Sequence, residues 1–321
     1  MVGVDLRGKI AVVTGASDGI GFHTAVSLAR AGCSKVFLPC RSMDKAVATV
    51  AAVSGAAGVA ADRLVACVCD LGNLESVREF TRFVRRADDA IDILVCNAGV
   101  MALPQRTATP QGFETQMAVN HLAHHLIIKQ LLPQLMRAKN GARVVCVSSI
   151  AHRIGQRAAL LDERLESPSY EPWTAYGNSK LANIIEAREL QERFGSSGVT
   201  FFSVHPGGIH TGLQEHVPLK TRLFWALVTP FFFKNVTQGA ATTLFCATNA
   251  AAKAHAGKYF FDCNAAATSL EDVVNDAELR KKFFETSDRL VAPWVDIDAT
   301  LERMATIGIN QGVEMLKKAF K

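Results

Sequence analysis

Long runs of one charge are missing from this sequence. Its formal net charge of +5 comes from 35 basic and 30 acidic residues spread along 321 positions. Nowhere do five or more lysines and arginines stand together, although nucleic-acid-binding proteins usually carry a basic patch or stripe. This absence argues against a nucleic-acid partner, and a solvated surface explains the small positive excess.

Features of exported and disulfide-bonded proteins are also missing. The N-terminal residues MVGVDLRGKIAVVTG have no basic start, no long apolar stretch and no small-residue cleavage site. No cysteine pair forms a C-x-x-C motif, and several cysteines lie in apolar, strand-like runs. We therefore expect buried free thiols and a cytoplasmic location. The eight cysteines are Cys33, Cys40, Cys67, Cys69, Cys96, Cys146, Cys246 and Cys263.

No linker, internal repeat or charge block divides the chain. From residue 8 to about 205, short apolar runs alternate with longer helical segments. This alternation predicts an α/β fold, with a doubly wound parallel sheet of about seven strands covered by helices on both faces. The expected strands are 9–14, 35–40, 63–69, 92–96, 142–148, 199–205 and 257–261, and the expected helices are 19–31, 42–54, 73–88, 112–138 and 173–194.

We assign residues 1–294 to one domain and residues 295–321 to a C-terminal helical tail. Within the domain, segment 207–236 contains LFWALVTPFFF, which is too short to span a bilayer and is broken by Pro230. We interpret it as a lid over an apolar substrate; a lid that also touches a membrane and ordinary core packing are the alternatives. For the tail we consider three roles: packing on the body of the protein, joining subunits, or contacting a membrane.

A glycine-rich turn follows the first expected strand and opens the first expected helix. TGASDGIG (14–21) places Gly15, Gly19 and Gly21 where backbone amides can approach a pyrophosphate, at a helix N-terminus that favours negative charge. This context predicts a Rossmann-type dinucleotide site, and a glycine-rich turn without a ligand is the alternative. Asp18 would repel a phosphate unless it points away or caps the helix.

The end of the second expected strand lacks the acid that usually binds the ribose of NAD. Its sequence is Pro39-Cys40-Arg41-Ser42. An arginine at this place can pair with the 2′-phosphate of NADP, so we expect NADP(H) as the cofactor. The alternative is a solvated arginine beside a serine that caps the next helix.

Tyrosine is scarce, and one of the three tyrosines stands one helical turn before a lysine. Tyr176 and Lys180 share a helix face, with Cβ atoms about 5–6 Å apart. A free phenol has a pKa of about 10, so acid–base work near neutrality needs a group that stabilises its anion. The lysine ammonium does so, and an oxidised nicotinamide adds positive charge. The spacing therefore predicts that Tyr176 and Lys180 form a catalytic pair. The alternative is that both residues simply lie on the surface of a helix.

Several short motifs in one order resemble the short-chain dehydrogenase/reductase family. The motifs are TGASDGIG, CNAG (96–99), Asn120 in VNHLAHH, VSS (147–149), YGNSK (176–180) and HPGGIHT (205–211). The resemblance covers most of the chain and implies a reversible carbonyl reduction by hydride transfer. It implies Tyr176 as acid/base, Lys180 as activator, Ser149 as the partner of the substrate oxygen and Asn120 as the holder of a relay water. Ser148 is a rival for Ser149.

The same resemblance implies the contacts to the cofactor. Asp70 meets the adenine, Asn97 to Gly99 line the adenosine side, and residues from Pro206 to Thr211 hold the nicotinamide carboxamide. The expected cofactor-binding residues are Gly15, Ser17, Asp18, Gly19, Ile20, Gly21, Arg41, Asp70, Leu71, Asn97, Ala98, Gly99, Tyr176, Lys180, Pro206, Gly207, Ile209 and Thr211.

An insertion, residues 150–172, separates Ser149 from Tyr176. Together with the segments 112–125, 228–240 and 257–263, it resembles the retinol dehydrogenase and WW-domain oxidoreductase branch. That branch implies an apolar aldehyde, ketone or alcohol, whether retinoid-like, steroid-like or xenobiotic, and the family implies a homo-oligomer. A catalytically silent protein that binds NADP(H) as a sensor or scaffold is the alternative function.

Three histidines, His121, His124 and His125, stand at helical spacing beside Asn120. Histidines placed i, i+3 and i+4 can share a metal ion on one helix face. No cysteine or acid nearby in the sequence completes such a site, so we expect packing or hydrogen bonding and no metal.

Overall fold

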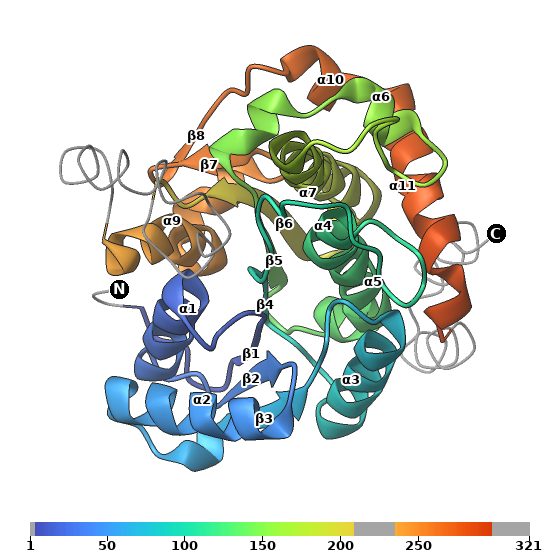
Figure 1. The fold of residues 1–321 in the computed structure, drawn as a ribbon. Helices are drawn as coiled ribbons and strands as arrows, with labels where there is room; N and C mark the ends of the chain where they lie inside the picture. The colour runs from blue at the N-terminus through green and yellow to red at the C-terminus, as the bar shows by residue number, and fades with distance from the viewer. Residues whose placement is uncertain (1–3, 209–234, 297–321) are drawn as a thin grey trace.

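The computed structural model describes residues 4–208 and 235–296, which form a central sheet with helices on both sides (Figure 1). In this part of the chain the sheet has eight strands in the order β3-β2-β1-β4-β5-β6-β7-β8. All neighbours are parallel except β7 and β8. The strands are β1 (Ile10–Val13), β2 (Lys35–Cys40), β3 (Leu64–Val68), β4 (Ile93–Cys96), β5 (Ala142–Val147), β6 (Val199–His205), β7 (Tyr259–Phe261) and β8 (Asn264–Ala265).

The order of the strands reverses between β1 and β4. The chain builds β1, β2 and β3 outward in one direction, then returns to place β4 on the other side of β1. In open parallel sheets, ligands bind in the crevice that such a reversal opens beyond the carboxyl ends of the strands. The predicted doubly wound sheet is therefore confirmed. The two-residue strand β8 was not expected.

Two apolar cores lie on the two faces of the sheet. Helices α1 (Gly19–Arg30), α2 (Met43–Ala57) and α9 (Val236–Thr248) cover one face. Helices α3 (Leu74–Ala87), α5 (Ala123–Met136) and α7 (Pro172–Phe194) cover the other. Successive strand residues point to opposite faces, so each strand contributes to both cores and reads as a continuous apolar run.

The helix expected at 112–138 is not a single regular helix. It begins as the short α4 (Thr115–Met117), widens into the π-helical turn η2 (Ala118–Leu122) and continues as α5. A π-turn adds a residue to the helix and is frequent at functional sites. Asn120 lies in this turn.

The insertion 150–172 contributes two short helices, η3 (Ile150–Ile154) and α6 (Arg157–Leu161). Helix η3 packs on α7, and α6 packs on α7 and on α11 (Ala277–Val291). The remaining short elements are η1 (Ala61–Arg63), η4 (Gly195–Ser197), η6 (Ala250–His255), α10 (Glu271–Asn275) and η7 (Ala292–Trp294).

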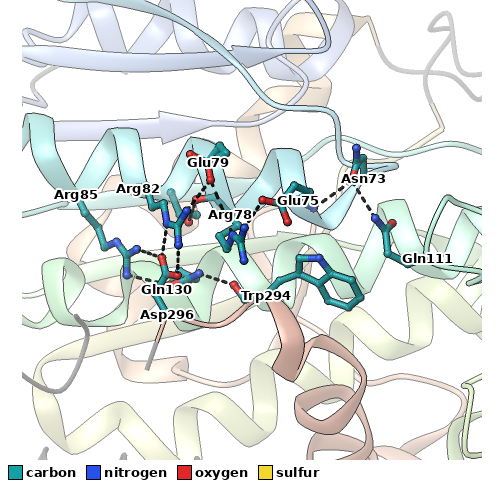
Figure 2. Close-up of polar contacts among 11 residues, drawn as sticks. Asn73, Glu75, Arg78, Glu79, Arg82, Arg85, Gln111, Gln130, Trp294 and Asp296 are labelled. Carbon is teal, nitrogen blue, oxygen red and sulfur yellow. Dashed lines mark hydrogen bonds and ion pairs between the residues drawn. The ribbon is translucent and has the colours of Figure 1, made fainter. Parts of the chain in front are cut away.

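The end of the described chain returns to α3, as Figure 2 shows. Arg82 donates to Asp296 through Nε (2.9 Å to Oδ2) and Nη2 (2.7 Å to Oδ1). Arg85 also donates to Asp296, and its Nη1 lies 2.9 Å from Oε1 of Gln130 on α5. Gln130 in turn donates to the carbonyl of Trp294 (2.9 Å). These contacts tie residues 294–296 to α3 and α5.

The cysteines are all free thiols, and all except Cys263 are buried, as expected. Among the helices of residues 4–208 and 235–296, none combines the length and the hydropathy that a membrane span requires. The expected lid and tail lie outside the described residues, except for 207–208, 235–236 and 295–296.

Candidate active site

The phosphate turn is shaped by glycines. Gly15 (φ +69°) and Gly19 (φ +59°) adopt the left-handed conformation that other residues rarely tolerate. A Cβ on Gly15 would also lie 2.8 Å from Cα of Ala98. Asp18 caps α1, with Oδ1 accepting from the amide of Gly19 (2.7 Å). Its carboxylate is therefore held as a helix cap, which meets the condition for tolerating an acid in this turn.

The donors at the start of α1 suit an anion. Within the part of the chain that the structure describes, no group accepts a hydrogen bond from the amides of Ile20 and Gly21. Free amides at a helix N-terminus combine with the helix dipole to bind phosphate groups. The turn from Gly15 through Ser17 to Gly21 therefore fits the pyrophosphate of a dinucleotide.

The ends of β2 and β3 lie side by side. The amide of Cys69 donates to the carbonyl of Cys40 (2.7 Å), which brings the following residues, Arg41 and Asp70, to adjoining strand ends. Arg41 is exposed. Oδ1 of Asp70 accepts from the amide of Gly72 (2.9 Å), which fixes the direction of this carboxylate ahead of the buried Leu71 and α3. Both residues therefore lie at the carboxyl end of the sheet, and their predicted contacts with the adenosine half of a dinucleotide stay predictions.

The turn of residues 97–99 is fastened to the end of β1. The amides of Asn97 and Ala98 donate to Oγ1 of Thr14 (2.9 and 3.0 Å). A Cβ on Gly99 would lie 2.9 Å from Oδ1 of Asn120 and 3.4 Å from Nζ of Lys180. The phosphate turn, residues 97–99 and two of the expected catalytic residues are thus brought together.

The two serines after β5 have different partners. The side chain of Ser149 lies close enough to Tyr176 to lower the pKa of the phenol, and its Oγ accepts from the amide of Ala151 (3.2 Å) at the start of η3. Ser148 is buried and donates to the carbonyl of Lys180 (2.7 Å). Only Ser149 is therefore placed to share a substrate oxygen with Tyr176.

Tyr176 is buried at 6% exposure. Burial raises its pKa to about 12, and the side chain of Ser149 offsets only part of that effect. Desolvation is therefore the dominant influence on this phenol. The stabilisation of the phenolate by Lys180 and an oxidised nicotinamide stays a prediction. Near neutral pH the phenol is protonated and can donate a proton.

Lys180 lies beside the phenol ring and carries its charge at neutral pH. Its Nζ is 5.6 Å from the ring centroid of Tyr176 and donates to the carbonyl of Val147 (3.0 Å). Burial lowers the pKa of Lys180 to about 8. The ammonium is therefore mostly protonated below pH 8, in an environment where charge acts strongly on its neighbours.

The side chain of Asn120 joins three segments. Its Oδ1 accepts from the amide of Val100 (2.8 Å), and its Nδ2 donates to the carbonyl of Val100 (2.9 Å) and to Oγ of Ser179 (2.8 Å). Ser179 in turn donates to the carbonyl of Tyr176 (2.7 Å). The sequence predicts a water-holding role for Asn120, but the structure also makes it a bridge between the 97–100 segment and α7.

Sequence reasoning missed Thr14, Ser179 and Gly177, although all three lie inside quoted motifs. Gly177 follows Tyr176 at the point where α7 touches η3. A Cβ there would lie 2.7 Å from the carbonyl oxygen of Ala151 and from Cγ1 of Ile154. Thr14 and Ser179 could have been singled out because each is a hydroxyl residue within a motif, Thr14 at the start of the glycine-rich turn and Ser179 just before Lys180.

The three histidines face different neighbours. His121 pairs with Ser287 (2.9 Å), whereas His124 contacts Oγ1 of Thr14 and the carbonyl of Asn120. This matches the expected hydrogen bonding beside Asn120.

His125 lies between two carboxylates. Its Nδ1 is 2.7 Å from Glu186, and its Nε2 is 2.8 Å from Asp288, which also pairs with Lys129. Burial lowers the pKa of His125, but the two carboxylates outweigh it and raise the pKa to about 9. Atoms of His121, His125 and Glu186 that could ligate a metal ion do lie within 4.8 Å of one another. Both ring nitrogens of His125, however, already form hydrogen bonds with carboxylates. The absence of a metal stays a prediction.

Exposed apolar side chains follow the carboxyl end of β5 and end β7. Ile150 and Ile154 follow Ser149 and are 45% and 48% exposed. Phe261 ends β7 and stacks on His205, with ring centroids 5.2 Å apart. Pro206 is buried, and Gly207 has φ +96°. Ile209 and Thr211 lie outside the described residues.

Known proteins resemble this chain in sequence and in fold. Residues 9–161 match the family model for short chain dehydrogenases. The chain is 35% identical over 298 residues to the WW domain-containing oxidoreductase of Drosophila melanogaster, covering 92% of this chain and 71% of that protein. It is 38% identical over 260 residues to retinol dehydrogenase 12 of Mus musculus, covering 81% and 79%. Its fold resembles a Pseudomonas aeruginosa RhlG/NADP active-site complex, with a TM-score of 0.63 and 26% identity over 80% of this chain and 95% of that one.

Proposed function

This chain belongs to the short-chain dehydrogenase family of oxidoreductases, and on that premise we propose that it reversibly reduces an apolar aldehyde or ketone to an alcohol with NADPH. The observation that carries the proposal is the convergence of three side chains after the carboxyl end of β5. Tyr176 is buried, Nζ of Lys180 lies 5.6 Å from its ring centroid, and Ser149 is close enough to lower the pKa of the phenol. These residues lie beside the phosphate turn and the 97–99 turn, and this position supports a nicotinamide cofactor as the source of hydride.

The residues divide the work of carbonyl reduction among them. Tyr176, protonated near neutral pH, gives its hydroxyl proton to the carbonyl oxygen as the carbon gains a hydride. Ser149 donates a hydrogen bond to the same oxygen, where negative charge develops. The ammonium of Lys180 stabilises the phenolate that Tyr176 leaves behind. A bound nicotinamide cofactor supplies the hydride, or accepts it in the reverse direction.

Two observations support NADP(H) over NAD(H). The end of β2 carries the exposed Arg41 where NAD-binding proteins usually carry an acid. A guanidinium matches the geometry and charge of a 2′-phosphate. One solved relative is itself an NADP complex. Both the arginine and the solved complex bear on the choice between NADP(H) and NAD(H), and neither depends on the identity of the substrate.

The apolar substrate is supported by both the site and the relatives. Ile150, Ile154 and Phe261 present apolar side chains at the carboxyl edge of the sheet, and similar proteins include retinol dehydrogenases 11 and 12. We therefore propose a retinoid-like, steroid-like or xenobiotic carbonyl or alcohol. A homo-oligomer and a peripheral membrane contact are proposals that rest on the sequence alone.

The test begins with cofactor binding. The purified protein is titrated with NADPH and with NADH while nicotinamide fluorescence is followed. We expect tighter binding of NADPH, and Arg41→Ala should remove that preference. Lys253→Ala, which removes an exposed positive charge in η6, is the matched control. A preference for NADH in the unmodified protein would overturn the Arg41 argument.

Turnover is then measured with a panel of apolar aldehydes, ketones and alcohols. Tyr176→Phe should lower kcat by at least about a hundredfold, since general acid catalysis typically contributes that much, while NADPH affinity stays within about twofold. Tight NADPH binding without consumption of any substrate would instead favour the silent sensor or scaffold.

A further inference from the structure

The hydroxyl group of Thr14 has a fully determined set of hydrogen bonds. A threonine hydroxyl has one proton to donate and two lone pairs to accept with. Both lone pairs are used by the amides of Asn97 and Ala98 (2.9 and 3.0 Å). The proton faces two acceptors, Nε2 of His124 at 2.9 Å and the carbonyl of Val95 at 3.3 Å. The shorter contact assigns the proton to His124.

This assignment also determines the tautomer of His124. Because Nε2 accepts from Thr14, the imidazole proton must be on Nδ1, which lies 3.1 Å from the carbonyl oxygen of Asn120. A carbonyl can only accept, so the Nδ1 proton is needed there as well. Burial lowers the pKa of His124 to about 4, which agrees with a neutral ring. An imidazolium would aim a second proton at a hydroxyl that has no lone pair left.

From His124 the hydrogen bonds continue to the catalytic helix. Asn120, whose backbone carbonyl accepts from His124, bonds through its side chain to Val100 and to Ser179 of α7. Ser179 donates to the carbonyl of Tyr176. Between the 97–98 amides and Tyr176, His124 is the only titratable side chain in this series of described contacts.

We propose that His124 is a positioning residue that holds the 97–99 turn and the end of β1 in register with Asn120 and the catalytic helix α7. It does not contact the reacting atoms, and it reaches the glycine-rich turn only through the hydroxyl of Thr14. It acts by directing the Thr14 proton away from the turn, so that both hydroxyl lone pairs face the amides of Asn97 and Ala98. The inference rests on the proposed function only in assigning that turn to the cofactor.

Three substitutions at His124 separate its two hydrogen bonds. His124→Leu removes both. His124→Gln puts an amide near the place of Nε2, so it can still accept from Thr14. His124→Asn puts an amide near the place of Nδ1, so it can still donate to Asn120. Hydrogen exchange at the amides of Asn97 and Ala98 is measured in each variant without any cofactor, and NADPH affinity is measured by fluorescence.

We expect His124→Leu to speed exchange at both amides and to weaken NADPH binding about tenfold, because losing one partner of a buried hydrogen bond has an effect of this size. His124→Gln should restore exchange protection and affinity to within about threefold, whereas His124→Asn should not restore either. A purely structural role for the ring would not distinguish the glutamine variant from the asparagine variant in this way.

His121→Leu is the matched control, since His121 is also a buried histidine beside Asn120 but bonds to Ser287 of α11. It should lower stability without changing exchange at Asn97 and Ala98 or NADPH affinity. The inference is overturned if His124→Leu exchanges at those amides like the unmodified protein, or if both leucine variants behave alike. Failure of the unmodified protein to bind NADPH or NADH would count against the proposed function alone, since the exchange readout needs no cofactor.

Discussion

Tyr176 and Lys180 show how burial acts in opposite directions on an acid and a base. Desolvation disfavours the charged form of each group, so it raises the pKa of the tyrosine to about 12 and lowers the pKa of the lysine to about 8. At neutral pH both groups are protonated. The pair is therefore poised for giving a proton, which is the direction that carbonyl reduction requires.

The pKa of Lys180 predicts a pH dependence for reduction. As pH rises through about 8, the lysine loses the positive charge that stabilises the phenolate of Tyr176. We expect kcat for carbonyl reduction to be level below pH 8 and to fall about tenfold per unit well above it. Lys180→Arg keeps its charge at all these pH values, so any activity it retains should not fall there. A level profile for the unmodified protein up to pH 10 would contradict this role.

At the scale of single residues, the sequence predicted identities better than contacts. Tyr176, Lys180, Ser149 and Asn120 were predicted from motif order. The structure places them near one another, and their catalytic roles stay predictions. The motifs could not show that Ser148 bonds to the lysine carbonyl or that Asn120 bonds to Ser179. Those contacts depend on how β5, η2 and α7 approach one another, which no local pattern records.

The contact between η3 and α7 positions Ser149 relative to Tyr176. Gly177 allows it, because the backbone of Ala151 passes where a Cβ would stand. A backbone carbonyl cannot rotate away as a flexible side chain can, so η3 itself would have to move.

Gly177→Ala should therefore lower kcat by at least about tenfold while NADPH affinity changes by less than about twofold, because a small misplacement of a reacting group is costly. Steady-state kinetics and the fluorescence titration measure the two quantities. Gly55→Ala in α2 is the control, since nothing lies within 4 Å of its added Cβ. It should leave kcat unchanged and stabilise the protein by about 0.5–1 kcal/mol. Unchanged kcat in Gly177→Ala would show that η3 does not position Ser149.

Helix α11 is held against α5 and α7 by charges that are shielded from water. His125 of α5 donates to Glu186 of α7 and Asp288 of α11, and Lys129 also pairs with Asp288. Two carboxylates are balanced by an imidazolium and an ammonium. Such a cluster is stable only while the histidine keeps its proton, since an unpaired buried charge is costly.

Folding raises the pKa of His125 from 6.5 to about 9. The stabilisation is fully present below pH 6.5 and is lost as pH rises through 9, because between these values the folded state keeps a proton that the unfolded state has lost. We expect the free energy of unfolding to fall by a few kcal/mol, on the order of 1.4 kcal/mol per pKa unit, between pH 6.5 and 9.5. Urea unfolding at several pH values measures this. His125→Gln should abolish most of the pH dependence in that window, and an equally steep dependence in that variant would refute the assignment.

At the scale of elements, regular structure was predictable and irregular structure was not. The seven expected strands lie within two residues of their predicted ends, because buried parallel strands read as unbroken apolar runs. The π-turn at Ala118–Leu122 and the short β8 were missed. The first contains Asn120, whose side chain bonds to distant segments that no local pattern records, and the second is only two residues long.

At the scale of the whole molecule, one carboxylate near the end of the described chain, that of Asp296, pairs with residues of α3 that are more than 200 positions earlier in the sequence. Asp296 pairs with Arg82 and with Arg85, and the side chain of Arg85 is 6% exposed. Removing the acid takes the carboxylate of Asp296 away from a largely buried guanidinium. The site residues take no part in these contacts.

Asp296→Ala should reduce the free energy of unfolding by about 2 kcal/mol, which is below the full cost of breaking a buried ion pair because the cluster is partly solvated. Denaturant unfolding measures the change, and kcat should stay the same. Asp89→Ala is the control, since Asp89 is 90% exposed in its pair with Arg137. That change should alter stability by less than about 0.5 kcal/mol. Equal effects in the two variants would mean that Asp296 is an ordinary surface charge.

The distribution of thiols gives the molecule a built-in reporter of its own folding. Seven of the eight cysteines are buried on the two faces of the sheet or beneath the helices, and Cys263 alone is partly accessible. A thiol reagent should therefore modify the native protein once and the unfolded protein eight times. Counting the added mass over time would follow the opening of the core directly, and a probe attached at Cys263 would mark the β7–β8 turn without any engineered residue.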